Sequence, residues 1–259
     1  MVKLKIIAWN IHGAANFDKK YEMPDFVAEM IISMKADIIV LTEYIKNDSS
    51  EKLYKKLQAG YFIFEFYEEG KNGVFMGIRR DIKGLNVDLE KDNKELISSF
   101  NEDVDFLQAN ISINDKPISI VGSRVRIKLN GSKEEKSNCK QKQYDKLSNY
   151  SKELGSNFIM IGDLNARGTW LKKNIEFNGG EVHVIEGNSY YWMNYGNLAG
   201  APLDNCISKG LTFLNSEYIW DFREIEENKD VYYNKEGRLA LPVRKSYPDH
   251  AILVTNFEV

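Results

Sequence analysis

Apolar residues occur along this chain in short runs separated by polar segments. Seven runs have the length of strands, and they cover residues 4–8, 38–41, 74–78, 106–113, 118–121, 158–161 and 251–254. Runs of this length that are rich in Ile, Val, Leu and Phe predict strands. The run 106–113 alternates, and a turn cluster at 114–117 separates it from the run 118–121, so the sequence predicts a hairpin there.

Two segments between these runs have helical spacing. After Pro24, which suits a first helical turn, the apolar residues Phe26, Val27, Met30, Ile31 and Met34 fall on one face. A second helix is predicted from Asn138, as N-cap, to Gly155, which supplies a C-terminal stop. Strands that alternate with helices and hairpins indicate a mixed α/β structure.

Polar side chains that can bind a metal or move a proton follow three of the most apolar runs. They are Asn10, Glu43 and Asp163. Packing in a core gives no reason for such endings. Because ligands of α/β proteins gather beyond the carboxyl ends of strands, we expect one amide and two carboxylates around a common crevice.

Length and composition indicate one large globular unit. The chain has 259 residues, 43% of them hydrophobic, with five scattered prolines and no repeat or linker, so we expect a single domain over residues 1–259. A formal net charge of −3 argues against a protein that holds nucleic acid by a broad basic face. Any contact with phosphate is therefore expected to be local.

The cysteines and the N-terminal segment bear on the compartment. Cys139 and Cys206 are too few for a disulfide framework or a thiolate metal site. The apolar stretch that begins the chain is broken by lysines and is too short for a signal peptide, and no run approaches the roughly 20 residues needed to cross a bilayer. We expect a cytoplasmic protein that does not insert into membranes, and no protein partner is evident.

The side chains at the strand ends favour a divalent cation. Asp, Glu and Asn offer oxygen ligands, which magnesium and manganese prefer, and Glu43 is the leading candidate ligand. Capping of a surface strand is the alternative for Glu43. Asp163 and Asn165 lie two residues apart and would face the same way on an extended backbone, whereas a simple turn is the alternative there.

His250 is one of three histidines, with His12 and His183. Histidine is the usual general acid or base near neutral pH, although a single histidine is more often structural. The neighbouring Asp249, or Asp204, could orient its ring.

Four segments in order along the chain resemble the motifs of the endonuclease/exonuclease/phosphatase superfamily. They are Trp9-Asn10-Ile11-His12-Gly13, Leu41-Thr42-Glu43, Gly162-Asp163-Leu164-Asn165 and Tyr247-Pro248-Asp249-His250. The segment 72–79 resembles the central Gly-Val strand of that family, so the resemblance spans residues 4 to 255. It implies a four-layer α/β/β/α sandwich, in which two packed mixed sheets are flanked by helices.

The resemblance also implies roles for individual residues. Asn10, Glu43 and Asp249 would bind or adjoin a magnesium or manganese ion, and Asp163 would position and deprotonate the attacking water. Asn165 would hold the phosphate. His250, oriented by Asp204, would contact the scissile phosphate, and His12 in the first motif is a further candidate for substrate binding.

One position departs from the family pattern. After the central hairpin strand, relatives carry histidine or tyrosine, but this chain has Arg124 and Arg126. A guanidinium can bind phosphate through two hydrogen bonds and a permanent charge, but it cannot give and recapture a proton. We treat both arginines as candidate phosphate contacts.

These observations favour a metal-dependent phosphodiester hydrolase, with a nuclease that cleaves DNA or RNA as the first hypothesis. A phosphatase or phosphodiesterase for a lipid headgroup or small phosphoester is the second, and an inactive member that binds nucleic acid or protein is the third. The aromatic stretch 188–195 could be core, line a small-molecule pocket or stack on unpaired bases.

Overall fold

The computed structural model describes residues 1–11, 23, 25–67, 72–87, 104–194, 197–223 and 248–259. Within these residues the strands form two six-stranded sheets and one two-stranded sheet. The first sheet has the order β13–β14–β1–β2–β4–β3 and the second has the order β5–β6–β7–β8–β12–β9. Both are mixed, because β1 runs parallel to β2 and antiparallel to β14, while β7 runs parallel to β8 and antiparallel to β6.

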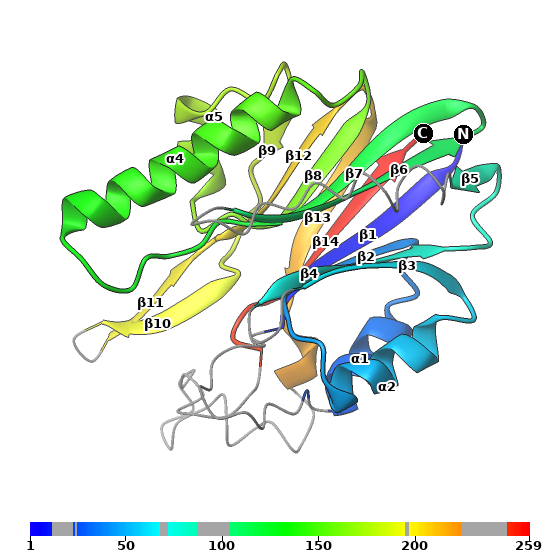
Figure 1. Cartoon of the computed structure of the whole chain (residues 1–259), viewed down its shortest axis with the longest axis horizontal. Helices are drawn as coiled ribbons and strands as arrows, with labels where there is room; N and C mark the ends of the chain where they lie inside the picture. The colour runs from blue at the N-terminus through cyan, green and yellow to red at the C-terminus, as the bar shows by residue number, and fades with distance from the viewer. Residues whose placement is uncertain (12–22, 24, 68–71, 88–103, 195–196, 224–247) are drawn as a thin grey trace.

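The strands of the first sheet are β1 (Lys3–Asn10), β2 (Ile38–Tyr44), β3 (Tyr61–Phe66), β4 (Gly73–Arg79), β13 (Thr212–Ile219) and β14 (Ile252–Glu258). Those of the second are β5 (Leu85–Val87), β6 (Asp105–Ile113), β7 (Lys116–Arg124), β8 (Phe158–Asp163), β9 (Glu181–His183) and β12 (Asp204–Lys209). The small sheet is the hairpin of β10 (Tyr190–Asn194) and β11 (Asn197–Ala201), which projects from the body in Figure 1.

Helices cover the outer faces of the two large sheets. Helices α1 (Asp25–Ser33) and α2 (Asp48–Leu57) lie against the first sheet, and α4 (Lys133–Ser151) and α5 (Gly168–Asn174) lie against the second (Figure 1). A short 3-10 helix, η1 (Asp221–Arg223), follows β13. The architecture is the α/β/β/α sandwich that the sequence predicted.

Three separate apolar clusters correspond to the three interfaces between these layers. One fills the space between the sheets, one lies under α1 and α2, and one lies under α4 and α5. Strand β8 shows how the sequence serves two of them, because Ile159 and Ile161 face the other sheet whereas Phe158 and Met160 face the helices. Strands buried on both faces need apolar residues at every position, which explains the unbroken runs.

All seven predicted runs form strands, and β6 and β7 form the predicted hairpin. The predicted N-cap at Asn138 is wrong. Helix α4 begins at Lys133, where Ser132 and Glu135 form a capping box. The first turns of α4 are largely exposed, so they lack the apolar spacing from which the start was inferred. Pro24 lies outside the described residues, although α1 begins directly after it.

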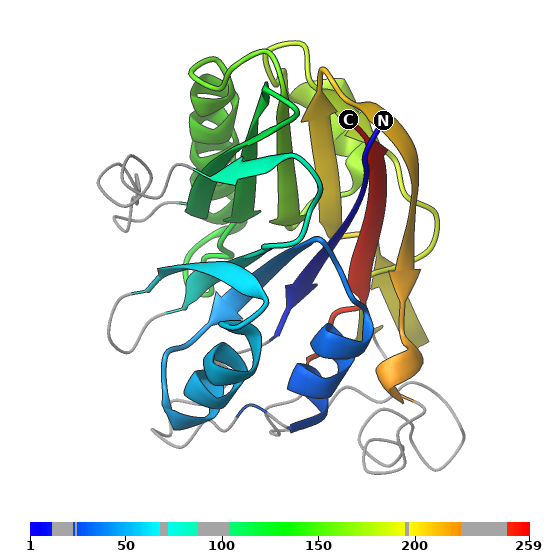
Figure 2. The ribbon, with the colours of Figure 1, turned by 90° about the vertical axis from the view of Figure 1, so that its right-hand side faces the viewer.

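The course of the chain divides the sheets in a simple way. Residues 3–79 and 212–258 supply the strands of the first sheet, and residues 85–209 supply those of the second. The two ends of the chain lie side by side in both views (Figure 2), where Val2 and Val259 exchange backbone hydrogen bonds. Among the helices described, none is long and apolar enough to span a bilayer.

Candidate active site

The strand ends singled out in the sequence meet at one edge of the sandwich. Asn10 ends β1, Asp163 ends β8, and Glu43 lies near the end of β2. The Asn10 amide Nδ2 donates to Glu43 Oε1 at 3.1 Å and to Asp163 Oδ2 at 3.0 Å. The expectation of one amide and two carboxylates at a common place is confirmed, and the amide joins the two sheets there.

Glu43 occupies a β-bulge rather than a regular strand position. In the pairing of β2 with β4, Thr42 lies opposite Val74 and Tyr44 lies opposite Gly73, so Glu43 is the extra residue. Its φ is 53°, in the left-handed region that costs a non-glycine residue free energy. A bulge re-aims a side chain, and here it gives the Glu43 carboxylate its contacts with Asn10 and with the second sheet.

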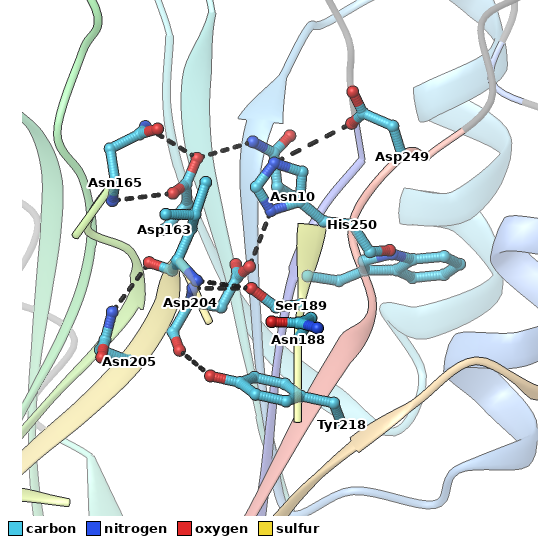
Figure 3. Close-up of polar contacts among 12 residues, drawn as sticks. Asn10, Asp163, Asn165, Asn188, Ser189, Asp204, Asn205, Tyr218, Asp249 and His250 are labelled. Atoms are coloured by element: carbon cyan, nitrogen blue, oxygen red, sulfur yellow. Dashed lines mark hydrogen bonds and ion pairs between the residues drawn. The ribbon is translucent and has the colours of Figure 1, made fainter. Parts of the chain in front are cut away.

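Asp163 and Asn165 form a tight turn that fixes the Asp163 carboxylate. The backbone N–H of Asn165 donates to Asp163 Oδ1 at 3.0 Å, and Asn165 Nδ2 donates to Asp163 Oδ2 at 3.1 Å and to Val125 O at 2.7 Å. Asn165 has a φ of 51°, so the backbone is not extended as expected. The structure has the turn that was the alternative, and this turn brings the Asn165 amide to the Asp163 carboxylate (Figure 3).

His250 is held by a second buried carboxylate. Its Nδ1 lies 2.7 Å from Asp204 Oδ2, and its Nε2 lies 4.0 Å from Asp249 Oδ1 (Figure 3). Asp204 lies directly opposite Asp163 in the pairing of β12 with β8. The ring therefore sits beside two neighbouring strand ends of the other sheet, with one nitrogen already committed to Asp204.

Several residues that the sequence did not single out support this pair. Ser189 Oγ accepts the backbone N–H of Asp204 at 3.0 Å, and Tyr218 donates its hydroxyl to Asp204 O at 2.6 Å. Trp9 Nε1 donates to His250 O at 2.9 Å, and the Tyr190 ring contacts the His250 ring at 4.8 Å between centroids. Trp9 lay in a motif, and Ser189 and Tyr190 lay in the aromatic stretch. The sequence does not reveal that these segments and Tyr218 lie close to Asp204 and His250.

Arg124 reaches the same cluster from the end of β7. Its Nη2 lies 2.6 Å from Glu43 Oε1, and its Nη1 lies 3.4 Å from Asp105 Oδ2. Arg126 also binds Asp105, through Nε at 2.8 Å. Asp105 is fully buried and was missed by the sequence analysis, which offered no motif around it. The two arginines thus share an internal carboxylate, and Arg124 in addition occupies one side of Glu43.

Burial and charge shift the proton affinities of the central groups. Burial raises the pKa of Asp163, and the carboxylates of Asp204 and Glu43 raise it further, while His250 and Arg124 oppose the shift. Burial lowers the pKa of His250, but the charges of Asp204, Asp163 and Asp249 outweigh it and raise that pKa to about 10. A positive imidazolium between carboxylates is the stable arrangement at neutral pH.

The structure places all but one of the predicted site residues. Nine of them lie within this cluster or bound to it: Asn10, Glu43, Arg124, Arg126, Asp163, Asn165, Asp204, Asp249 and His250. His12 lies outside the described residues. The roles of these residues stay predictions, since proximity alone does not assign them.

Comparisons with known proteins find likeness in structure but not in sequence. No family model and no curated protein matches the sequence. The fold matches TDP2 from D. rerio in complex with a single strand DNA product, with a TM-score of 0.66 and 16% identity over 99% of both chains. It also matches ANGEL2, a 2',3'-cyclic phosphatase, with a TM-score of 0.64 and 10% identity over 99% of this chain and 95% of that one.

A third match is an endonuclease/exonuclease/phosphatase from Beutenbergia cavernae DSM 12333, with a TM-score of 0.55 and 12% identity over 100% of this chain and 72% of that one. The chain has the endonuclease/exonuclease/phosphatase fold. At these identities the likeness establishes the architecture, and the chemistry has to be argued from the site.

Within the endonuclease/exonuclease/phosphatase fold, this site has the donors for a cation. Ligand atoms of Asp163, Asp204 and His250 lie within 4.8 Å of one another. Asp204 Oδ1 is buried and accepts no hydrogen bond from the described residues. Carboxylates and an amide make up most of the surrounding polar groups, and such oxygen donors suit magnesium or manganese. The residues therefore fit a hard divalent cation.

Proposed function

We propose that this protein is a divalent-cation-dependent phosphodiesterase and that its substrate is a nucleic acid. The observation that carries the proposal is the pair of facing strand ends, where the buried Asp163 carboxylate lies opposite Asp204, which in turn holds His250. A positioned base beside an imidazole fixed by a carboxylate is what hydrolysis of a phosphodiester requires. The likeness to TDP2, which binds a single strand DNA product, supports nucleic acid as substrate.

Glu43, with Asn10 and Asp249, is the donor set that we assign to magnesium or manganese. Such an ion, when bound, stabilises negative charge on the phosphate and the leaving oxygen. His250 is left out of this donor set, because its Nδ1 is bonded to Asp204 and its Nε2 carries a proton in the imidazolium form. Asp163 and Asp204 are two further carboxylates beside this donor set, and their oxygens lie close enough together to share an ion.

Asp163 is the residue that we assign to the attacking water. Three hydrogen bonds from Asn10 and Asn165 fix its two oxygens. Burial raises the pKa of Asp163, which makes it a better acceptor of a proton than an exposed aspartate. Asn165 uses its amide hydrogens on Asp163 and Val125, so we assign it to positioning Asp163, and its contact with phosphate stays a prediction.

His250 and Arg124 are the cationic groups that we assign to the phosphate. The imidazolium can stabilise the developing charge through Nε2–H and pass that proton to the leaving oxygen. Asp204 keeps the ring in place and keeps it protonated. Arg124 supplies a permanent charge where related proteins carry histidine or tyrosine, and it acts by binding rather than by proton transfer.

The test is hydrolysis of labelled plasmid and of short single- and double-stranded DNA and RNA with magnesium, manganese or a chelator. Wild type is compared with Glu43→Gln and Asp163→Asn, and with Glu181→Gln as a matched control at an exposed carboxylate of β9. We expect cleavage that needs the metal, that both site variants abolish and that the control keeps.

Absence of cleavage of every polymer, by a folded protein that binds the cation, would contradict a nucleic acid substrate. In that case small phosphoesters become the first candidates, in keeping with the likeness to ANGEL2, a 2',3'-cyclic phosphatase. Cation binding without turnover of any phosphodiester would favour the inactive alternative.

A further inference from the structure

A pocket of about 380 Å³ opens next to the candidate active site. Asn165, which positions Asp163, is part of its lining, so the pocket and the site share a wall. The other sides come from Lys140 and Tyr144 of α4, from Trp170 of α5 and from Trp192 of β10. Its volume lies within the range of pockets that hold small ligands, about 300–1,000 Å³.

The tryptophans of the pocket are not packed into the core. Trp170 is 39% exposed, and its ring lies 5.2 Å from the ring of Tyr144 between centroids. Trp192 is half-buried and stacks on Tyr190 at 5.9 Å. Tyr190 contacts the ring of His250 in turn. A series of aromatic rings therefore leads from the catalytic histidine into the pocket, and part of the indole surface faces solvent.

Cationic side chains accompany these rings. Lys140 is half-buried and donates from Nζ to Asn165 O. Arg167 also lines the pocket and is exposed, with a weak 3.4 Å contact from Nη2 to Gly200 O. A lysine and an arginine beside one exposed and one half-buried tryptophan form a surface that is aromatic in one part and positive in another. A nucleotide has the matching parts, a planar base and a phosphate.

We propose that this pocket binds the base and phosphate of the nucleotide next to the scissile phosphate, with the base stacked on Trp192 or Trp170. The inference rests on the proposed function and specifies its substrate as unpaired nucleic acid. A base inside a duplex is stacked on both sides and paired at its edge, so neither of its faces is free to stack on a tryptophan, whereas a face of an unpaired base is. Stacking needs no particular base, so the pocket selects single strands rather than sequences.

The decisive experiment removes the base and the tryptophan separately. Binding of fluorescently labelled single strands is measured by anisotropy in the presence of chelator, which prevents cleavage. One strand is intact, and the others carry a single abasic residue that is moved along the sequence. The proteins are wild type, Trp192→Ala, Trp170→Ala and the conservative Trp192→Phe. Phe213→Ala is the aromatic control, because Phe213 lies in β13 and does not line the pocket.

For one or both alanine variants we expect Kd for the intact strand to rise about 5- to 150-fold, the range found for base stacking on aromatic side chains. At one abasic position the same substitution should change Kd less than twofold, because the base that stacks on the tryptophan is already missing. Trp192→Phe should keep most of the affinity, and Phe213→Ala should change nothing. An equal loss at every abasic position, or no loss for either tryptophan, would overturn the proposal.

The lysine and arginine give an independent measurement. If Lys140 and Arg167 contact phosphate, Lys140→Gln and Arg167→Gln should each lower the slope of log Kd against log salt by about 0.7, the value for one phosphate of a single strand. An unchanged slope in both variants would show that neither Lys140 nor Arg167 contacts a phosphate of the strand.

The binding assay also separates this inference from the proposed activity. In one outcome, the tryptophan variants lose affinity at all but one abasic position while the wild type hydrolyses no nucleic acid in magnesium or manganese. That result would support the binding pocket and contradict the nuclease activity. Hydrolysis with equal loss at all abasic positions would do the reverse.

Discussion

Arg124 and a divalent cation carry charge of the same sign, and in the proposed site both would contact the same carboxylate, Glu43. The 2.6 Å ion pair between Arg124 and Glu43 therefore opposes the binding of the cation. We expect Arg124→Gln to bind manganese more tightly, by an order of magnitude or so, which corresponds to about 1.4 kcal/mol, and yet to hydrolyse substrate more slowly because the phosphate loses a cationic partner.

Manganese affinity by calorimetry and hydrolysis rates would check both parts of this prediction. Arg79→Gln is the control, since Arg79 pairs with Asp37 away from the site. Weaker manganese binding by Arg124→Gln would mean that the arginine holds Glu43 ready for the ion rather than competing with it.

His250 is expected to account for a large part of the rate. His250→Gln removes the imidazolium, so kcat should fall by about 10²- to 10⁴-fold, the usual size of general acid and electrostatic catalysis. A loss smaller than about threefold would contradict the assigned role.

In the proposed mechanism Asp204 acts through His250, as a positioning residue. Asp204→Asn keeps the size of the side chain but removes the charge that holds the ring protonated. We expect a lower kcat with little change in KM, and a shift of the His250 Nδ1 resonance in ¹⁵N spectra, which a purely structural role would not produce. An unchanged resonance would show that the 2.7 Å contact has no electronic effect.

At the scale of residues, the sequence predicted the chemical types at the site but not their partners. Asn10, Glu43 and Asp163 follow apolar strands and were found for that reason. Asp105 and Ser189 do not follow an apolar run, and only the tertiary structure brings them to Arg124 and Asp204. The bulge at Glu43 was equally hidden, since no glycine or asparagine marks its positive φ.

At the scale of elements, the close approach of the two sheets depends on Gly122 in β7. A Cβ at this position would lie 2.6 Å from Val40 Cγ1 and 3.1 Å from Val74 Cγ1, both in the first sheet. We expect Gly122→Ala to lower the free energy of unfolding by about 1–3 kcal/mol, the usual cost of overpacking. Urea unfolding would measure it.

Gly155→Ala is the matched control for that substitution. No atom lies within 4 Å of a Cβ built at Gly155, so its replacement should be neutral or slightly stabilising. Equal effects of the two alanines would show that the sheets can separate enough to admit a methyl group without cost.

Elements with a strong apolar pattern were predictable, and elements defined by local or polar signals were less so. β1, β2 and β8 are unbroken apolar runs and appeared where expected. Helix α4 has an amphipathic pattern only in its later turns, and its start depended on the pair Ser132 and Glu135. Helix α5, with seven residues, is too short for periodicity to identify.

At the scale of the whole molecule, a bound cation should stabilise the sandwich. Its proposed ligands come from different parts of the chain, and the unfolded chain does not hold them together. Manganese at 100 times its Kd should add about 2.7 kcal/mol to the free energy of unfolding, which raises Tm by several degrees. Glu43→Gln should lose most of this increase in a calorimetric scan, and retention of the full increase would place the ion elsewhere.

Three polar contacts at the site each join one sheet to the other: Asn10 with Asp163, Arg124 with Glu43, and Asp204 with His250. The residues of the proposed active site are thus divided between the two sheets. A relative slip of about 1 Å would misalign the reacting groups, at a cost of up to about 100-fold in rate, while the apolar interior still held. On heating or in denaturant, the rate of hydrolysis should therefore fall before the protein unfolds. The rate would report a small relative shift of the two sheets that a melting curve does not detect.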